Sequence, residues 1–200
     1  VDHRGEVVDG DQMLYIIASS RRASGRLHGG VVGTLMSNLG LEQALAAQQV
    51  PFRRANVGDR YVMAMLQQEG WELGGETSGH LLCLDKSTTG DGIVAALEVL
   101  AVVRQSGKSL ADLKAGMQIF PQTMINVRMS KRFDLKASVP VQKALGEVEK
   151  ELAANGRVVL RASGTEPVVR VMIEGRDPAL VARLGQQLAD TVKRAAEEAA

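Results

Sequence analysis

Short apolar segments alternate with longer segments of helical apolar spacing through the first 117 residues, and this alternation restricts the fold most. The segment 29–33 reads as a buried strand between glycines, whereas Ile93, Val94, Leu97 and Leu100 recur at the spacing of one helix face. Strands that alternate with helices of this length are typical of a mostly parallel sheet covered by helices. The expected strands are 29–33, 52–57, 71–73 and 80–84, and the expected helices are 13–17, 35–47, 61–68 and 92–105.

A different pattern begins near Met117. Strands are expected at 122–129, 157–160 and 168–174, with a helix at 141–154. The final helix has a clear start, because Asp177 can cap it and Pro178 suits the first helical position. We therefore predict two domains in an α/β protein. Residues 1–117 form a helix-covered mixed or parallel β-sheet domain, and residues 118–200 form a small α+β domain with an antiparallel sheet and two helices.

Composition and charge exclude several classes of protein. Of the 200 residues, 45% are hydrophobic, which argues against an intrinsically disordered chain. The formal net charge is +1, from 24 basic and 23 acidic side chains, without the basic excess of a nucleic-acid-binding domain. No apolar stretch approaches the roughly 18 residues of a membrane span, and no signal peptide is evident. The sequence therefore predicts a cytoplasmic protein with neither nucleic acid nor membrane as a partner.

The single cysteine and the first residues carry two smaller expectations. Cys83 lies in an apolar run, where it cannot form an internal disulfide and is expected to be buried and unreactive. The chain begins with Val1, and the segment 1–7 reads as the inner part of a hairpin that turns at Arg4-Gly5. We therefore expect a piece of a longer protein.

The segment 161–167, followed by Arg170, joins two predicted strands and carries chemistry that a plain turn does not require. It places an arginine on each side of the hydroxyl residues Ser163 and Thr165, with Gly164 between them. Free backbone N–H groups of such a turn can form an anion nest, and arginine adds donors that match two phosphate oxygens. The residues alone leave two interpretations open, a phosphate site and a capped turn.

The segment 74–80 places two glycines, an acid, hydroxyls and an imidazole between two apolar strands. Glu76 can accept from sugar hydroxyls or bind an amine, Ser78 can donate and accept, and His80 can do either or bind phosphate. A hairpin with polar residues that face water explains the same pattern equally well.

Two further segments have structural explanations that we favour. In the segment 57–61, Asp59 can cap the following helix while Arg60 faces solvent. Asp9 and Asp11 resemble metal ligands, but two alternate carboxylates without a third ligand are weak evidence for a cation, so helix capping is preferred. The three histidines also lack metal-ligand spacing, and no metal site is predicted in this chain.

Together these segments resemble the α-D-phosphohexomutases, in the same order along the chain. The segment 75–80, Gly-Glu-Thr-Ser-Gly-His, resembles the sugar-specificity loop of the family's third domain. The segment 161–170 resembles the phosphate-binding loop of its fourth domain. Three other segments, 34–38, 57–62 and 88–92, are similar to the branch of the family that acts on an amino sugar phosphate. The resemblance covers essentially all 200 residues.

The resemblance implies a reaction for the complete protein. A phosphoserine gives its phosphoryl group to a hexose phosphate, the bisphosphate reorients, and the other phosphate returns to the serine. The expected conversion is between glucosamine 6-phosphate and glucosamine 1-phosphate, which feeds UDP-N-acetylglucosamine synthesis and hence cell-wall precursors. The serine loop and the Mg²⁺ ligands are expected in N-terminal domains absent from this chain, which are its partners. The chain alone should therefore be inactive.

The resemblance also implies roles for residues of this chain. Glu76 and Ser78 hold sugar hydroxyls, while His80 contacts phosphate or assists proton transfer and Arg60 lies near the reacting centre. The phosphate that is not reacting is held by Arg161, Ser163, Gly164, Thr165 and Arg170. Two alternatives stay open: a phosphomannomutase or phosphoglucomutase of the same family, and a non-catalytic module that binds sugar phosphates.

Overall fold

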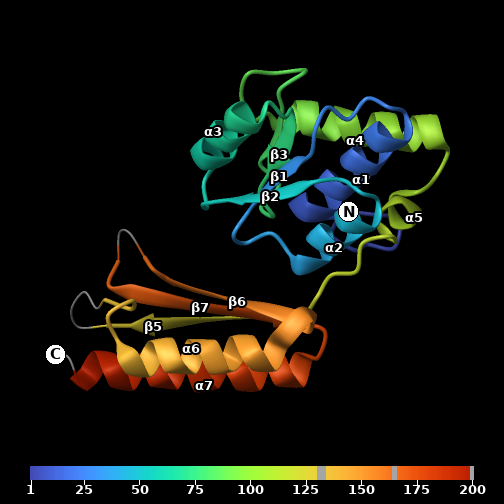
Figure 1. Ribbon diagram of the computed structural model, residues 1–200. Coiled ribbons are helices and arrows are strands. Elements are labelled where there is room, and N and C mark those ends of the chain that lie inside the picture. Colours follow the sequence, from blue (N-terminus) through green and yellow to red (C-terminus); the bar gives the residue numbers. More distant parts are fainter. Residues whose placement is uncertain (130–133, 164–165, 199–200) are drawn as a thin grey trace. The chain divides into compact units, whose positions relative to one another are not determined.

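The computed structural model describes residues 1–129, 134–163 and 166–198, which divide into two compact units (Figure 1). The first unit spans Val1–Ile119 and the second Phe120–Ala200. None of the described helices is both long and apolar enough to span a membrane.

The first unit is built on a four-stranded mixed sheet in the order β2-β1-β3-β4. Strands β1 (Val31–Thr34), β2 (Phe52–Ala55) and β3 (Leu73–Gly75) run parallel, and β4 (Leu81–Cys83) runs antiparallel to β3. Its helices are α1 (Gly10–Ala23), α2 (Leu39–Ala47), α3 (Asp59–Glu69), α4 (Gly92–Ser106) and the short α5 (Leu110–Lys114).

Both faces of this sheet are covered, so that β1, β3 and β4 are buried along their whole length. Val31 packs into one cluster with residues of α1, α2 and α4, whereas its neighbour Val32 packs into another with Val62 and Leu66 of α3. Cys83 is buried in the first cluster, as predicted, and burial raises the pKa of its thiol to about 11. A helix-covered mixed sheet was the fold predicted for this part of the chain.

Helix α2 begins at Leu39, four residues later than the sequence predicts. Residues 35–38 form a turn instead, because three polar side chains compete with helical backbone bonding. The Thr34 hydroxyl accepts from the Met36 N–H (3.1 Å), and the Ser37 hydroxyl accepts from the Thr34 N–H (3.0 Å). Asn38 then caps the helix by accepting from the Gly40 N–H (2.9 Å).

Two glycines that were expected in a loop belong to strand β3. A Cβ atom at Gly74 would lie 2.8 Å from the Val32 carbonyl oxygen, and one at Gly75 would lie 2.8 Å from that of His80. The strand therefore needs glycine because neighbouring backbone approaches it closely. The turn predicted at Arg4-Gly5 is present, with φ of +80° at Gly5, but residues 1–9 form no strands beside it.

The second unit is a three-stranded antiparallel sheet with two helices on one face (Figure 1). Strand β7 (Val168–Gly175) lies between β5 (Gln122–Arg128) and β6 (Gly156–Ala162). Helix α6 (Val139–Leu152), followed by a 3₁₀ turn (Ala153–Asn155), and helix α7 (Pro178–Glu198) share a buried cluster with Val169, Val171 and Ile173. As predicted, Asp177 caps α7, because its carboxylate accepts from the N–H groups of Ala179 (2.9 Å) and Leu180 (3.3 Å). This confirms the predicted fold class.

Candidate functional site

Glu76 is the first residue after β3, and it contacts the segment that precedes α3. Its Oε1 accepts from the Gly58 N–H at 3.0 Å, so the 57–61 segment and the 75–80 segment lie side by side. Gly58 has φ of +125°, a conformation that side chains rarely adopt. It precedes Asp59, the first residue of α3, which therefore does not cap this helix as the sequence suggested. Because a carboxylate has two acceptor oxygens, Glu76 retains capacity for a second donor.

His80 lies at the other end of the same loop and brings a third segment into the group. Its Nε2 is 3.5 Å from Asp59 Oδ2, and both side chains are exposed to solvent. A Cβ atom at Gly90 would lie 2.2 Å from the same Nε2, so the 88–92 segment packs directly against the imidazole. Ser78 is exposed between Glu76 and His80. The structure thus gathers Glu76, Ser78 and His80 with two segments that the sequence analysis singled out separately.

Arg60 is directed toward its own neighbour. Its guanidinium lies 4.6 Å from the centre of the Tyr61 ring and donates to the Tyr61 hydroxyl at 2.7 Å. In the described part of the chain it forms no hydrogen bond or ion pair with Glu76, Ser78 or His80.

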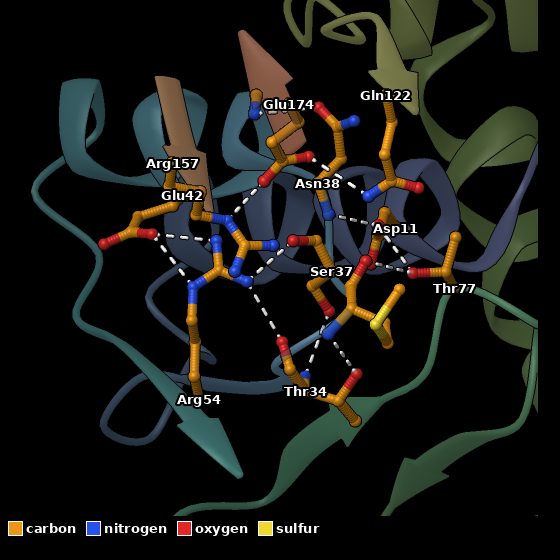
Figure 2. Close-up of polar contacts among 12 residues, drawn as sticks. Asp11, Thr34, Ser37, Asn38, Glu42, Arg54, Thr77, Gln122, Arg157 and Glu174 are labelled. Atoms are coloured by element: carbon orange, nitrogen blue, oxygen red, sulfur yellow. Dashed lines mark hydrogen bonds and ion pairs between the residues drawn. The ribbon is translucent and has the colours of Figure 1, made fainter. Parts of the chain in front are cut away.

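A buried polar cluster that includes Asp11 contacts the 76–80 loop at Thr77 (Figure 2). Asp9 caps α1, as predicted, by accepting from the Gln12 N–H at 2.8 Å. Asp11 is not a cap: it is fully buried, and its Oδ2 accepts from the Asn38 N–H (2.7 Å) and the Thr77 hydroxyl (2.9 Å). Burial raises the pKa of the Asp11 carboxyl, and those two donors partly oppose the rise.

Arg54, which no sequence pattern indicated, fixes the turn at residues 35–38, just before α2. It extends from β2 and donates to the carbonyl oxygens of Thr34 (3.0 Å) and Ser37 (2.6 Å) and to the Glu42 carboxylate (2.8 Å) (Figure 2). These bonds hold Asn38 where its N–H reaches Asp11. Period-two alternation in β2 could not reveal this role, because its partners lie in other elements.

The implied magnesium ion does not fit the described residues. Within 1–129, 134–163 and 166–198, no three His, Cys, Asp or Glu side chains are arranged to hold a metal. Asp9 is engaged as a helix cap, and the Oδ2 atom of the buried Asp11 already accepts from two protein donors. No reaction step is therefore assigned to a metal held by this chain.

In the second unit, Arg161 and Arg170 lie directly opposite each other on neighbouring strands. The register pairs Arg161 with Arg170 and Arg170 with Asn126, so all three share the sheet face opposite the buried Val169 and Val171. Neither guanidinium group has a hydrogen-bonded or ionic partner within the described residues. Two like charges directly opposite in a sheet are destabilising. The pair is therefore typical of a site for an anion rather than of a structural contact.

An arginine elsewhere on the same face provides the contrast. Arg157 pairs in register with Glu174 and forms an ion pair with it, and Glu174 also accepts from Gln122 (3.3 Å) (Figure 2). Glu174 is fully buried. The sheet thus neutralises one arginine with a carboxylate and leaves the row at Arg161 and Arg170 positively charged.

A pocket of about 450 Å³ opens beside Arg170. Its walls come from the end of β5 and the start of β7. The lining residues are Asn126, Arg128, Met129, Glu166, Pro167, Val168 and Arg170. Asn126 and Arg128 were not singled out from the sequence, although their alternation with the half-buried Ile125 and the buried Val127 places them on one strand face.

One N–H group of the predicted anion nest, that of Ser163, is already hydrogen-bonded. The Ser163 N–H donates to the Val168 carbonyl oxygen at 2.7 Å, so it is engaged within the hairpin. Gly164 and Thr165, the other predicted phosphate-binding residues of this turn, lie outside the described residues. In the described residues, the positive charge of this region therefore comes from arginine side chains.

Two family models cover most of the chain. Residues 9–120 match the α/β/α domain III of phosphoglucomutase/phosphomannomutase, and residues 124–191 match the C-terminal domain of the same proteins. The chain therefore belongs to the phosphoglucomutase/phosphomannomutase family.

Several relatives within this family have names that specify an amino sugar. Phosphoglucosamine mutase from Methylococcus capsulatus is 60% identical over 196 residues, which are 98% of this chain and 44% of that protein. The same enzyme from Methylobacillus flagellatus is 54% identical over 195 residues, which are 98% of this chain and 43% of that protein. The chain thus spans less than half the length of these relatives.

Solved structures show the same fold at low sequence identity. A crystal structure of Aspergillus fumigatus N-acetylphosphoglucosamine mutase in complex with GlcNAc-6P and magnesium has a TM-score of 0.78 and 20% identity, covering 94% of this chain and 47% of that one. A phosphoglucomutase/phosphomannomutase family protein from Burkholderia thailandensis has a TM-score of 0.71 and 18% identity, covering 96% and 43%.

Proposed function

We propose that the complete protein interconverts glucosamine 6-phosphate and glucosamine 1-phosphate, and that this chain supplies recognition of the sugar and of a phosphate. The observation that carries the proposal is the Arg161–Arg170 pair, two opposed arginines whose guanidinium groups form no ion pair within the described residues. Planar guanidinium groups match phosphate oxygens with two donors each. Relatives named phosphoglucosamine mutase support the choice of an amino sugar.

Each recognition residue has a distinct proposed task. Arg161 and Arg170 hold the phosphate that is not reacting, with Ser163, Gly164 and Thr165 in the connecting turn. Glu76 accepts from a hydroxyl or the amino group of the sugar, and Ser78 donates or accepts beside it. His80, with Asp59 beside it, contacts phosphate or transfers a proton. Arg60 would need to leave Tyr61 to assist at the reacting centre.

Phosphoryl transfer itself is proposed to occur on residues outside this chain, in the cytoplasm. Such transfers depend mainly on positioning and on electrostatic stabilisation, to which a magnesium ion held by the N-terminal domains would contribute. The product would serve the synthesis of UDP-N-acetylglucosamine. This chain on its own should bind its ligand without turnover.

An NMR titration of the 200-residue chain with inorganic phosphate and with glucosamine 1-phosphate tests the proposal. We expect affinities on the order of millimolar, equivalent to about 4 kcal/mol. Arg161→Ala and Arg170→Ala should each weaken phosphate binding about tenfold, as expected for the loss of a charge-assisted hydrogen bond. Arg194→Ala, on the solvent side of α7, is the matched control. Equal weakening in the control, or none in either site variant, would contradict the proposed phosphate site.

Activity and sugar preference require a chimera. The matching 44% of the Methylococcus capsulatus relative would be replaced by this chain and assayed with phosphates of glucosamine, glucose and mannose. We expect the amino sugar to give the highest kcat/KM. Preference for glucose or mannose phosphate would favour the alternative mutases, and binding without turnover in any chimera would favour a non-catalytic module.

A further inference from the structure

The start of helix α1 lies directly against the loop that carries Glu76, Ser78 and His80. The Gly10 N–H donates to the Thr77 carbonyl oxygen at 2.9 Å. A Cβ atom at Gly10 would lie 2.0 Å from the Glu76 carbonyl oxygen and 2.7 Å from the Gly79 nitrogen. Any other residue at position 10 would therefore displace the loop, because the obstructing atoms are backbone.

Asp11 binds the same loop through a side chain. Its Oδ2 accepts from the Thr77 hydroxyl at 2.9 Å and from the Asn38 N–H at 2.7 Å. One buried carboxylate thus joins the loop to the turn before α2, which Arg54 holds in place. The loop is fixed at Thr77 by both its carbonyl and its hydroxyl.

The burial of Asp11 is not explained by stability alone. Enclosing a carboxylate opposes its charged form, which is why burial raises its pKa. Replacing both partners of a buried hydrogen bond by apolar groups of the same shape can be nearly neutral or even stabilising. What the carboxylate provides instead is a directional bond to Thr77, between the two proposed sugar contacts Glu76 and Ser78.

We propose that Gly10 and Asp11 form a latch that holds the 76–80 loop in its sugar-binding conformation. This inference rests on the proposed sugar contacts of Glu76 and Ser78. Gly10 and Asp11 are positioning residues, because they act through the backbone and hydroxyl of Thr77. The bonds to Thr77 thereby hold the exposed Ser78 and His80 at fixed positions on either side of Gly79.

Two variants and two matched controls test the latch in the 200-residue chain. Thr77→Val removes the hydroxyl that binds Asp11, whereas Thr77→Ser keeps it. Gly10→Ala introduces the obstructing Cβ at the first residue of α1. Gly92→Ala makes the same change at the first residue of α4, where a Cβ would meet nothing within 4 Å.

Hydrogen exchange of two loop amides reports on the latch independently of any ligand. The Glu76 N–H donates to the His80 carbonyl oxygen (3.1 Å), and the Gly79 N–H donates to that of Glu76 (2.9 Å). We expect both amides to exchange about tenfold faster in Thr77→Val, as for the loss of one hydrogen bond to a charged group. Gly10→Ala should also speed their exchange, because its Cβ would displace the loop backbone. The two controls should exchange at the parent rate. Unchanged exchange in both variants would overturn the latch.

Ligand affinity separates positioning from a merely structural role. Thr77→Val and Gly10→Ala should weaken glucosamine 1-phosphate while leaving inorganic phosphate unchanged, and Thr77→Ser should restore the sugar affinity. Glu76→Gln reports on the sugar contact itself. If Glu76→Gln weakens the sugar phosphate and the latch variants do not, the latch is wrong and the proposed function stands. If Glu76→Gln also has no effect while loop exchange rises, the proposed sugar contact of Glu76 is wrong, and so is the proposal that the latch maintains a sugar-binding conformation.

Discussion

At the residue scale, the enclosed carboxyl group of Asp11 should give the chain a characteristic dependence of stability on pH. Burial raises its pKa above the ordinary 3.8, so the folded chain retains this proton at pH values where the unfolded chain has lost it. The contribution of Asp11 to the free energy of unfolding should therefore be greatest below pH 3.8, and it should fall as the pH rises through the raised pKa.

Asp11→Asn removes this titration while nearly preserving the shape of the side chain. The effect is measured by urea unfolding of both proteins at several pH values between roughly 3.5 and 7, where carboxyl groups titrate. The free energy of unfolding of the parent minus that of the variant should decrease as the pH rises. A difference that does not change with pH, or one that increases, would show that the carboxyl is not destabilised by burial.

The two aspartates before and inside α1 show what a sequence reveals about single residues. The role of Asp9 was predictable, because a cap depends on the amide of Gln12 only three positions away. The role of Asp11 was not, because its partner Thr77 lies 66 positions along the chain. Likewise, Arg161 and Arg170 were conspicuous as a motif, whereas Arg128 became a candidate through the pocket that the strands enclose.

At the scale of elements, the cap of α7 offers the clearest test of a local contribution to stability. Asp177→Ala removes the acceptor for the N–H groups of Ala179 and Leu180 and should lower the free energy of unfolding by about 1 kcal/mol. Asp177→Asn retains a side-chain oxygen and should restore most of the loss. Urea unfolding at neutral pH measures both. An alanine variant as stable as the parent would show that this helix is held by its apolar face alone.

Element types were more predictable than element bounds, for physical reasons that particular glycines illustrate. Gly74 and Gly75 resemble loop residues by composition, yet they lie in β3, where the backbone of Val32 in β1 and of His80, just before β4, approaches them closely. That approach depends on tertiary contacts, which local patterns do not contain. Helix α5 was missed because its single turn is too short for an apolar period, although its capping box at Ser109 and Asp112 was visible as a local signal.

At the scale of the whole chain, the two proposed recognition surfaces lie in different units. The 76–80 loop belongs to Val1–Ile119, and the Arg161–Arg170 pair belongs to Phe120–Ala200. Each unit has its own buried core, so neither surface needs residues of the other unit for the contacts described here.

This division leads to a prediction about the separated second unit. A polypeptide of residues 120–200 keeps Phe120, which is buried and lies under the Arg176 guanidinium at 5.5 Å, and keeps the entire cluster between the sheet and its two helices. It should fold cooperatively, as measured by thermal unfolding followed by circular dichroism. Its affinity for inorganic phosphate should match that of the 200-residue chain to within about twofold, the usual scatter between independent sites, and Arg170→Ala should abolish most of it. If the polypeptide folds and does not bind phosphate while the longer chain does, the phosphate site needs the first unit, and the Arg161–Arg170 pair is insufficient to form it.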